Sequence, residues 1–111
     1  MNWLAKLPPL KRRERSTESK LMDELEDEYD ILFVKVKPSR VGLPDRMALG
    51  HGEILLVELK REGEDLDETQ KAMHADLARR GIQVATFSSD DYKWIAECID
   101  LKLRIKSRGR R

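Results

Sequence analysis

The segment that most constrains the fold is Glu53–Lys60 (EILLVELK), an apolar run with charged residues at its ends. Its length and composition make it the strongest strand pattern in the chain. Two further strand patterns precede it, Ile31–Lys37 (ILFVKVK) and the shorter Arg46–Leu49, and the tight turn Gly50-His51-Gly52 forms the last link. Three strands joined by short links predict an antiparallel meander.

Helical patterns lie on both sides of these strands. Residues 17–29 place their apolar side chains on one stripe at helical spacing, and Ser16 or Thr17 can cap this helix. The pattern Asp67–Arg80 opens with a cap that Gln70 can complete as a capping box. Both helices therefore have their starts marked in the sequence.

The last part of the chain predicts one more strand and one more helix. Residues 83–87 (QVATF) have the composition of a strand, and an amphipathic helix is expected to begin near Asp90. The order αβββαβα predicts an α/β fold with one mixed sheet flanked by helices. If the fourth strand lies parallel to residues 53–60, the helix between them is a right-handed crossover. A chain of 111 residues has the length of one domain.

Charge is segregated along the chain. Residues 1–20 have a net charge of +4 and residues 101–111 of +6, which leaves −9 for the middle because the total is +1. Basic ends on an acidic body suggest arms that neutralise phosphates, and solubilising disordered tails are the alternative. We therefore expect a basic arm (1–15), a domain (16–100) and a basic C-terminal tail. The candidate DNA contacts in the arm and the tail are Arg12, Arg13, Arg104, Lys106 and Arg108.

The sequence carries no sign of a membrane segment or a secretory signal. No stretch approaches the roughly 20 apolar residues that span a bilayer. The first residues place their apolar part before their charges, the wrong order for a secretory signal. The single Cys98 cannot form an internal disulfide and fits a reducing compartment. We expect a cytoplasmic protein, with Cys98 in the core.

Asp45, Glu58 and Lys60 are the candidate reactive residues. Glu58 and Lys60 are two residues apart on one strand, so their side chains share a face, and hairpin pairing brings Asp45 near them. Carboxylates bind hard cations such as Mg²⁺, and a lysine beside the metal can activate water or stabilise a developing anion. The backbone carbonyl of Leu59 can be a further metal ligand if the strand frays or bulges there. The alternative is a solvated strand end with an ordinary ion pair.

Two helical residues point toward the same chemistry. Glu18 continues the apolar stripe of its helix, so its carboxylate should lie at the edge of the core and face a cation. A first-turn glutamate favoured by the helix dipole is the alternative. Gln70 also faces inward by its spacing, and its alternative is the capping-box role, because one side chain can hardly serve both.

Neither histidine has the spacing of a zinc site. His51 lies between two glycines and is expected to be an exposed loop residue. His74 lies one turn beyond Gln70, where it could contact DNA or the waters of a metal. A partly exposed helical histidine without a metal role is the favoured interpretation.

Together these residues resemble the VRR-NUC branch of the PD-(D/E)XK nucleases. The resemblance covers about residues 18–90. It comprises Lys35, Gly42-Leu43-Pro44-Asp45-Arg46, Glu58-Leu59-Lys60, Gln70, Gly81 before a strand, Ser88-Ser89-Asp90 after it, and an N-terminal helical glutamate. It implies a restriction-endonuclease-like fold. The combination is far more specific than the isolated Pro-Asp and Glu-x-Lys motifs.

The resemblance also implies roles for these residues. Asp45 and Glu58 would be ligands of Mg²⁺, for which Mn²⁺ can substitute, and Lys60 would be the catalytic lysine. Gln70 would line the site, and Glu18 would be the helical acid, with Glu28 as second choice. Two further residues are assigned to DNA contact, Arg46 and Lys35.

The predicted activity is metal-dependent hydrolysis of DNA. Short members of this family resemble phage or bacterial enzymes that act on branched DNA as homodimers, in recombination or repair. One chain offers one site, and cutting both strands of a Holliday junction takes two, so we expect a homodimer. A nuclease that nicks or cuts flaps, single strands or RNA is an alternative. A DNA-binding module that keeps the fold without catalysis is another.

Overall fold

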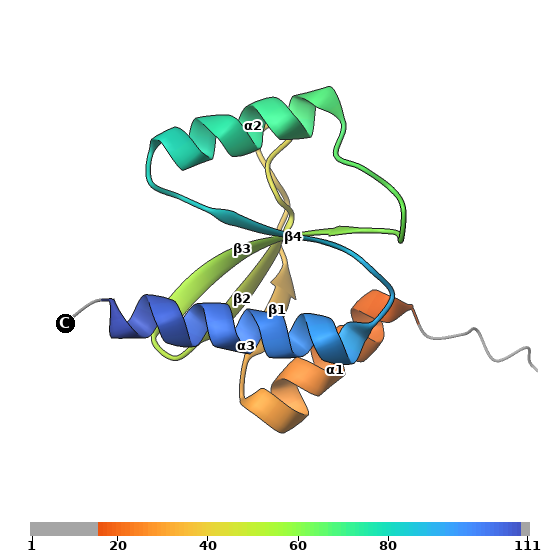
Figure 1. Ribbon diagram of the computed structural model, residues 1–111, viewed down its shortest axis with the longest axis vertical. Helices are drawn as coiled ribbons and strands as arrows, with labels where there is room; N and C mark the ends of the chain where they lie inside the picture. Colours follow the sequence, from red (N-terminus) through yellow and green to blue (C-terminus); the bar gives the residue numbers. More distant parts are fainter. Residues whose placement is uncertain (1–15, 110–111) are drawn as a thin grey trace, which may run out of the picture.

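A computed structural model describes residues 16–109 of the protein. In this part of the chain, helices and strands follow one another in the predicted order αβββαβα (Figure 1). They are α1 (Thr17–Tyr29), β1 (Leu32–Lys35), β2 (Arg46–Gly50), β3 (Glu53–Lys60), α2 (Glu68–Arg79), β4 (Val84–Ser88) and α3 (Tyr92–Arg108). The mixed α/β fold predicted from the sequence is confirmed, and it is consistent with the restriction-endonuclease-like class.

The four strands form one sheet in the order β1-β2-β3-β4. The first three are antiparallel neighbours, as the meander predicted, and β4 pairs in parallel with β3. In the β2–β3 hairpin Arg46 lies opposite Val57, and in the β3–β4 pair Glu58 lies beside Thr86. β4 is an edge strand, so one side of its backbone has no strand neighbour among residues 16–109.

The two faces of the sheet carry different helices. α1 and α3 lie on one face, and α2 lies on the other (Figure 1). Because side chains alternate along a strand, one set faces α1 and α3. This set forms the core with α1 and α3 and includes Phe33, Ala48, Leu55, Val57 and Phe87. α2 buries none of its own residues completely, so the α2 face of the sheet is the less covered one.

The predicted helix starts are confirmed by their caps. The Ser16 hydroxyl accepts a hydrogen bond of 3.1 Å from the backbone N–H of Ser19. At the start of α2, Asp67 and Gln70 form the complete capping box. Each cap satisfies backbone donors that the first helical turn leaves without partners.

The expected C-terminal tail is instead the second half of α3. This helix begins after its cap Asp91 and continues without a break to Arg108. Leu103 is completely buried, so apolar packing holds the helix well past residue 100. The tail was predicted from charge alone, and charged side chains on the solvent face of a helix produce the same composition. The expected N-terminal arm lies outside the described residues.

Core packing of α1 gives the first prediction. Leu21→Ala should lower the free energy of unfolding by about 2–5 kcal/mol, because this side chain is completely buried and its truncation leaves a cavity. Its neighbour Met22 is 39% exposed, so Met22→Ala is the matched control and should cost about 1 kcal/mol or less. Denaturant unfolding followed by circular dichroism measures both. Equal losses in the two variants would contradict the packing of α1.

Candidate active site

The register of the β2–β3 hairpin places Asp45 near Glu58. Arg46 is the first residue of β2 and pairs with Val57, so the residue before it lies across from the residue after Val57. The backbone of Asp45 is also held by the residue directly after β1, because its carbonyl accepts a hydrogen bond of 2.8 Å from the N–H of Val36. The expected approach of Asp45 to Glu58 therefore follows from two strand pairings.

The loop before Asp45 packs against α2 through Gly42. This glycine has a φ of +88°, and a Cβ atom built there would lie 2.7 Å from the carbonyl oxygen of Thr69. A larger residue would push the loop away from α2 and strain its own backbone. Gly42 thus positions the segment that carries Asp45, which gives the glycine of the predicted motif a physical role.

Glu58 is a buried carboxylate. The residue is 6% exposed, and its Oε1 atom is buried without a hydrogen-bond partner among the described residues. Burial raises the pKa of Glu58 above its ordinary value, and the negative charge of Asp45 raises it further. His74 and Lys60 act in the opposite direction and lower the pKa. These four residues therefore share one electrostatic site.

His74 is the site residue that the sequence interpretation undervalued. Its Nε2 atom lies 3.5 Å from Glu58 Oε1, and its side chain is only 13% exposed. Like Glu58 Oε1, this nitrogen is buried without a hydrogen-bond partner in the described part of the chain. The position one turn beyond Gln70 was the signal for it. His74 is a partly buried helical residue, and whether it has a metal role stays a prediction.

Lys60 and Leu59 lie at the end of β3. β3 pairs with β2 only as far as Val57, whereas it pairs with β4 as far as Lys60. The last three residues of β3 therefore have a strand neighbour on one side only. The Leu59 side chain packs against the core, as its position between Glu58 and Lys60 predicted. Whether its carbonyl binds a metal stays a prediction.

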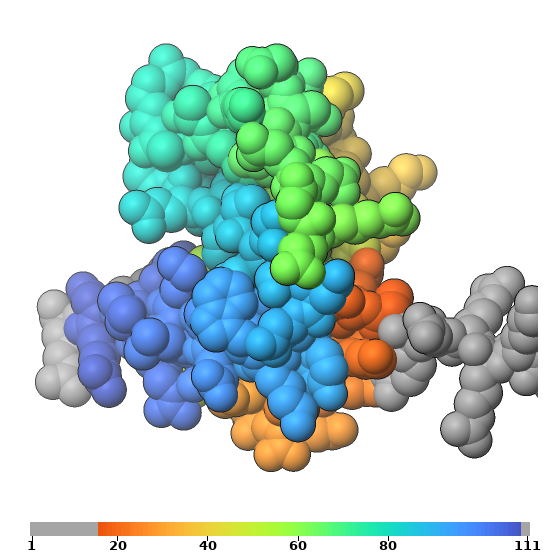
Figure 2. Space-filling model, turned by 45° about the vertical axis from the view of Figure 1, so that its right-hand side comes forward, coloured from red at the N-terminus to blue at the C-terminus, as the bar shows by residue number. Residues whose placement is uncertain are grey.

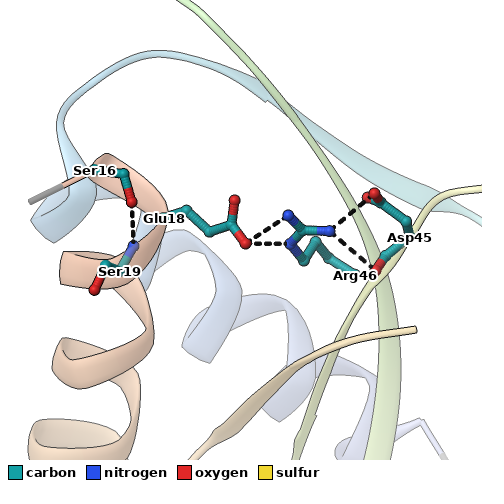
Figure 3. A network of polar contacts seen from close by, with 5 residues as sticks. All are labelled: Ser16, Glu18, Ser19, Asp45 and Arg46. Atoms are coloured by element: carbon teal, nitrogen blue, oxygen red, sulfur yellow. Dashed lines mark hydrogen bonds and ion pairs between the residues drawn. The ribbon is translucent and has the colours of Figure 1, made fainter. Parts of the chain in front are cut away.

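Arg46 connects Glu18 with Asp45 (Figure 3). Its Nε atom donates a hydrogen bond of 2.7 Å to Glu18 Oε1. Its Nη1 atom lies 2.9 Å from Asp45 Oδ2 and 3.2 Å from the carbonyl oxygen of the same residue. The Glu18 carboxylate thus faces a cation at the edge of the core, and the cation is Arg46. Glu28, the second choice for the helical acid, is exposed at the other end of α1.

This pairing changes the interpretation of Arg46. The side chain is 10% exposed and held by two carboxylates. Burial alone would lower the pKa of Arg46, but the hydrogen bond and charge of Glu18, together with Asp45, raise it overall. A guanidinium held in this way already has two anionic partners, and the expected contact of Arg46 with DNA stays a prediction. Sequence patterns did not pair Arg46 with Glu18 because the two residues are 28 positions apart in the chain.

Gln70 serves the capping box. Its side-chain oxygen accepts a hydrogen bond of 3.0 Å from the N–H of Asp67, and its own N–H donates to Asp67 Oδ1. Of the two roles weighed for Gln70, the cap is the one that the structure shows. A contact with the reacting groups stays a prediction.

The other predicted DNA contacts lie apart from Glu58. Lys35 is exposed and, with Glu18 and Arg46, lines a hollow of about 250 Å³ on the α1 side of the sheet. On α3, Arg104 binds Asp100, and Lys106 donates a hydrogen bond of 2.6 Å to the carbonyl oxygen of Ile54. Arg108 is exposed at the end of α3, and two candidates, Arg12 and Arg13, lie outside the described residues.

His51 is a loop residue with a specific partner. It occupies the hairpin turn with a φ of +54°, and its Nε2 atom lies 2.7 Å from Asp100 Oδ1. Its side chain is 25% exposed. The expected loop position is confirmed, but His51 also fixes the hairpin tip to α3.

The donor set of the site fits a hard divalent cation. Asp45 and Glu58 supply carboxylates, and the buried Glu58 Oε1 atom lacks a hydrogen-bond partner within the described range. No three His, Cys, Asp or Glu side chains between residues 16 and 109 are arranged to hold a metal together. A pair of carboxylates suffices for Mg²⁺, which typically binds one or two and retains several waters.

Comparison with known proteins supports a nuclease. No family model matches the chain. A protein of Acyrthosiphon pisum secondary endosymbiont phage 1, named "Putative nuclease p44", is 37% identical over 89 residues, which cover 79% of this chain and 96% of the phage protein. The chain belongs to the family of this phage nuclease.

The match to the phage nuclease family includes the candidate site. A match over 79% of the chain, wherever it begins, must include the β2–β3 hairpin and α2. Glu58 and Lys60 lie on β3, His74 lies on α2, and Asp45 directly precedes β2. In addition, no helix between residues 16 and 109 is long and apolar enough to cross a membrane.

The environment of Glu58 gives a pH prediction. Because burial and Asp45 raise its pKa above that of the unfolded chain, the folded state holds the proton more tightly. The contribution of Glu58 to stability is therefore lost as the pH rises through the raised pKa. Glu58→Gln should be more stable than the parent at neutral pH, and the difference should vanish below the ordinary glutamate pKa of 4.5.

Denaturant unfolding between about pH 4 and pH 8 with EDTA present measures this difference. The matched control is Glu62→Gln in the exposed loop after β3, which should show no such pH-dependent gain. If Glu58→Gln were no more stable than the parent at any pH, the carboxylate would not be destabilised by its surroundings.

Proposed function

We propose that this protein is a metal-dependent endonuclease that hydrolyses phosphodiester bonds in branched DNA, with a site of the VRR-NUC type. The observation that carries the proposal is the buried Glu58 carboxylate beside Asp45 and Lys60. Burying a carboxylate whose Oε1 atom lacks a hydrogen bond is unfavourable, and a bound cation would compensate for it. The family relationship to a phage nuclease supports the same chemistry.

Each residue has a part in the proposed mechanism. When bound, Mg²⁺ or Mn²⁺ would lower the pKa of a water and neutralise charge on the phosphate. Asp45 and Glu58 would hold that ion, and the Leu59 carbonyl is a further candidate ligand. The Lys60 ammonium would orient the attacking water or stabilise the negative charge that develops on the phosphate. The oxygen of the water forms the new bond to phosphorus and its proton passes to the solvent. The bond to the leaving sugar oxygen breaks, and that oxygen takes up a proton from the solvent.

The branched substrate and the homodimer belong to this proposal. The described residues contain one cluster of this kind, so cutting both strands of a Holliday junction requires a second copy. A fixed distance between two sites would select the shape of the DNA rather than its sequence. A nuclease that nicks DNA, or that cuts flaps or single strands, would use the same chemistry, but its copies would be arranged differently.

Removal of the proposed site groups should strongly slow cleavage. Asp45→Asn and Lys60→Ala should each lower the rate of metal-dependent cutting about a hundredfold or more. Lys93→Ala is the matched control, because this exposed lysine lies on α3, on the opposite face of the sheet. Cleavage of a labelled four-way junction with Mg²⁺ or EDTA measures the effect. Variants that cut as fast as the parent would refute the mechanism.

The substrate is tested with linear, flap, single-stranded and four-way DNA at equal concentrations. Preferred, paired cuts in the four-way junction would support a resolvase. Faster cutting of flaps or single strands would assign the same site to another substrate. Tight, salt-sensitive binding without metal-dependent cutting would show a DNA-binding module instead.

The two roles considered for Arg46 give different salt dependences. If Arg46 bound a phosphate, Arg46→Gln would reduce the slope of log affinity against log salt by about 1. We expect an unchanged slope and a loss of cleavage of about tenfold or more, because Asp45 loses its positioning contact. Glu18→Gln should show a smaller loss of the same kind, since it loosens Arg46 only. The affinity of Asp45→Asn for the junction is the reference for these slopes. A reduced slope in Arg46→Gln would show that Arg46 does contact a DNA phosphate.

A further inference from the structure

α3 has a second apolar face that the described part of the chain covers only in part. Its inner face packs in the core, but Trp94, Cys98, Leu101 and Ile105 lie on another side of the helix, which we call the outer stripe of α3. Cys98 is partly buried and also packs against the core, as the sequence predicted. Leu101 and Ile105 are each 58% exposed, and Trp94 is 49% exposed although its ring contacts Phe87 edge to face. Figure 2 shows α3 (blue) on the surface that faces the viewer.

The spacing of the outer stripe is that of a helix–helix seam. Its residues follow one another at intervals of four, three and four, the repeat by which two helices pack their side chains against each other. Scattered exposed apolar residues are common on protein surfaces. Four in heptad spacing on a 17-residue helix form a continuous line that fits a second helix.

We propose that the outer stripe of α3 binds the outer stripe of a second copy of this chain. A dimer with a twofold axis brings the same surface of both copies together, so the two helices must be antiparallel. The two central residues, Cys98 and Leu101, then lie against the partner's Leu101 and the partner's Cys98. At the ends, Trp94 packs against the partner's Ile105.

The charges beside the stripe fit this antiparallel arrangement. In antiparallel helix pairs, residues on the same flank face each other. Glu97 and Arg104 are one heptad apart on the same flank, so Glu97 would meet the partner's Arg104 and the reverse, which makes two ion pairs. Arg104 donates through Nε to Asp100, which leaves its terminal nitrogens for the partner. The other bases on α3, Lys93, Lys102, Lys106 and Arg108, do not oppose one another in this register.

A rival apolar surface lies on the α2 face of the sheet. Leu32 is 48% exposed and Ile54 is 54% exposed. Their face is also the face of Glu58, which must stay open to DNA. The stripe instead lies on α3, on the other face of the sheet, and its Ile105 end lines one hollow with Val84 of β4. A partner on α3 therefore stands beside the sheet and leaves the site accessible.

The surface predicts a weak, reversible dimer. One helix face with four apolar residues buries less than the roughly 800 Å² per partner of a standard interface. We expect a dissociation constant on the order of micromolar. The inference deepens the proposed function, since it supplies the second site that cutting a junction requires, but its test measures association and no cleavage.

Sedimentation equilibrium over a range of concentrations tests the surface. We expect the parent to dimerise and Leu101→Glu to weaken the dimer about a hundredfold or more, because it buries a charge in the seam. Ile54→Glu is the matched control with similar exposure and should leave the dimer unchanged. A monomeric parent at several hundred micromolar, or a dimer that only Ile54→Glu disrupts, would overturn the proposal.

Charge reversal tests the register and also keeps the proposal falsifiable if a stripe variant fails to fold. Glu97→Arg and Arg104→Glu should each weaken the homodimer, because like charges meet twice. A mixture of the two proteins should form a heterodimer, because every pair is then of opposite charge. Cys98 lies close to the twofold axis, so a short bismaleimide should cross-link the parent. If the mixture formed the heterodimer no more readily than the homodimers, the antiparallel seam would be contradicted.

Failure of the proposed dimer surface can be distinguished from failure of the proposed function. A dimer that cuts no DNA would retain the surface and refute the nuclease mechanism. A monomer that cuts or nicks DNA with Mg²⁺ would retain the mechanism and refute the surface. A partner other than a second copy would appear as a monomeric parent in the same experiment.

Discussion

The register of β2 against β3 is the constraint on which the site depends. With Arg46 opposite Val57, Asp45 lies across from Glu58 on the α2 face of the sheet. A slip of one residue would turn Glu58 and Lys60 toward α1 and α3 and would expose Val57, which is completely buried. The apolar core therefore selects the same pairing that assembles the charged cluster. The site needs no interaction of its own to bring its strands together.

The same pairing also buries a carboxylate at a cost in free energy. Glu58 stands in an apolar strand with Asp45 beside it, and both circumstances raise its pKa. His74 and Lys60 relieve this only in part, and two buried polar atoms of the cluster lack hydrogen bonds among the described residues. The site is destabilising on its own and contains oxygen ligands. A bound cation would offset this destabilisation. Stability and proposed function therefore oppose each other at Glu58.

Local signals predicted most of the fold and less of the site. The caps at Ser16 and Asp67 act within one helical turn, and the strand patterns act within one strand, so both could be recognised from the sequence. The contact between His74 and Glu58 depends on how α2 lies over the sheet, which no local pattern contains. Charge composition was misleading at the C-terminus, because a basic segment can be a free tail or the solvent face of α3.

Arg46 shows how the two faces of the sheet are coupled. Its strand position points toward α1, where Glu18 accepts its hydrogen bond, yet its guanidinium also contacts Asp45 at the start of β2. The position of the Asp45 carboxylate thus depends on the packing of α1 against the sheet. In a small protein with one core, a helix on one face of the sheet can in this way orient a side chain on the other face. Packing of α1 and α3 is therefore part of the site, although neither helix carries Glu58 or Lys60.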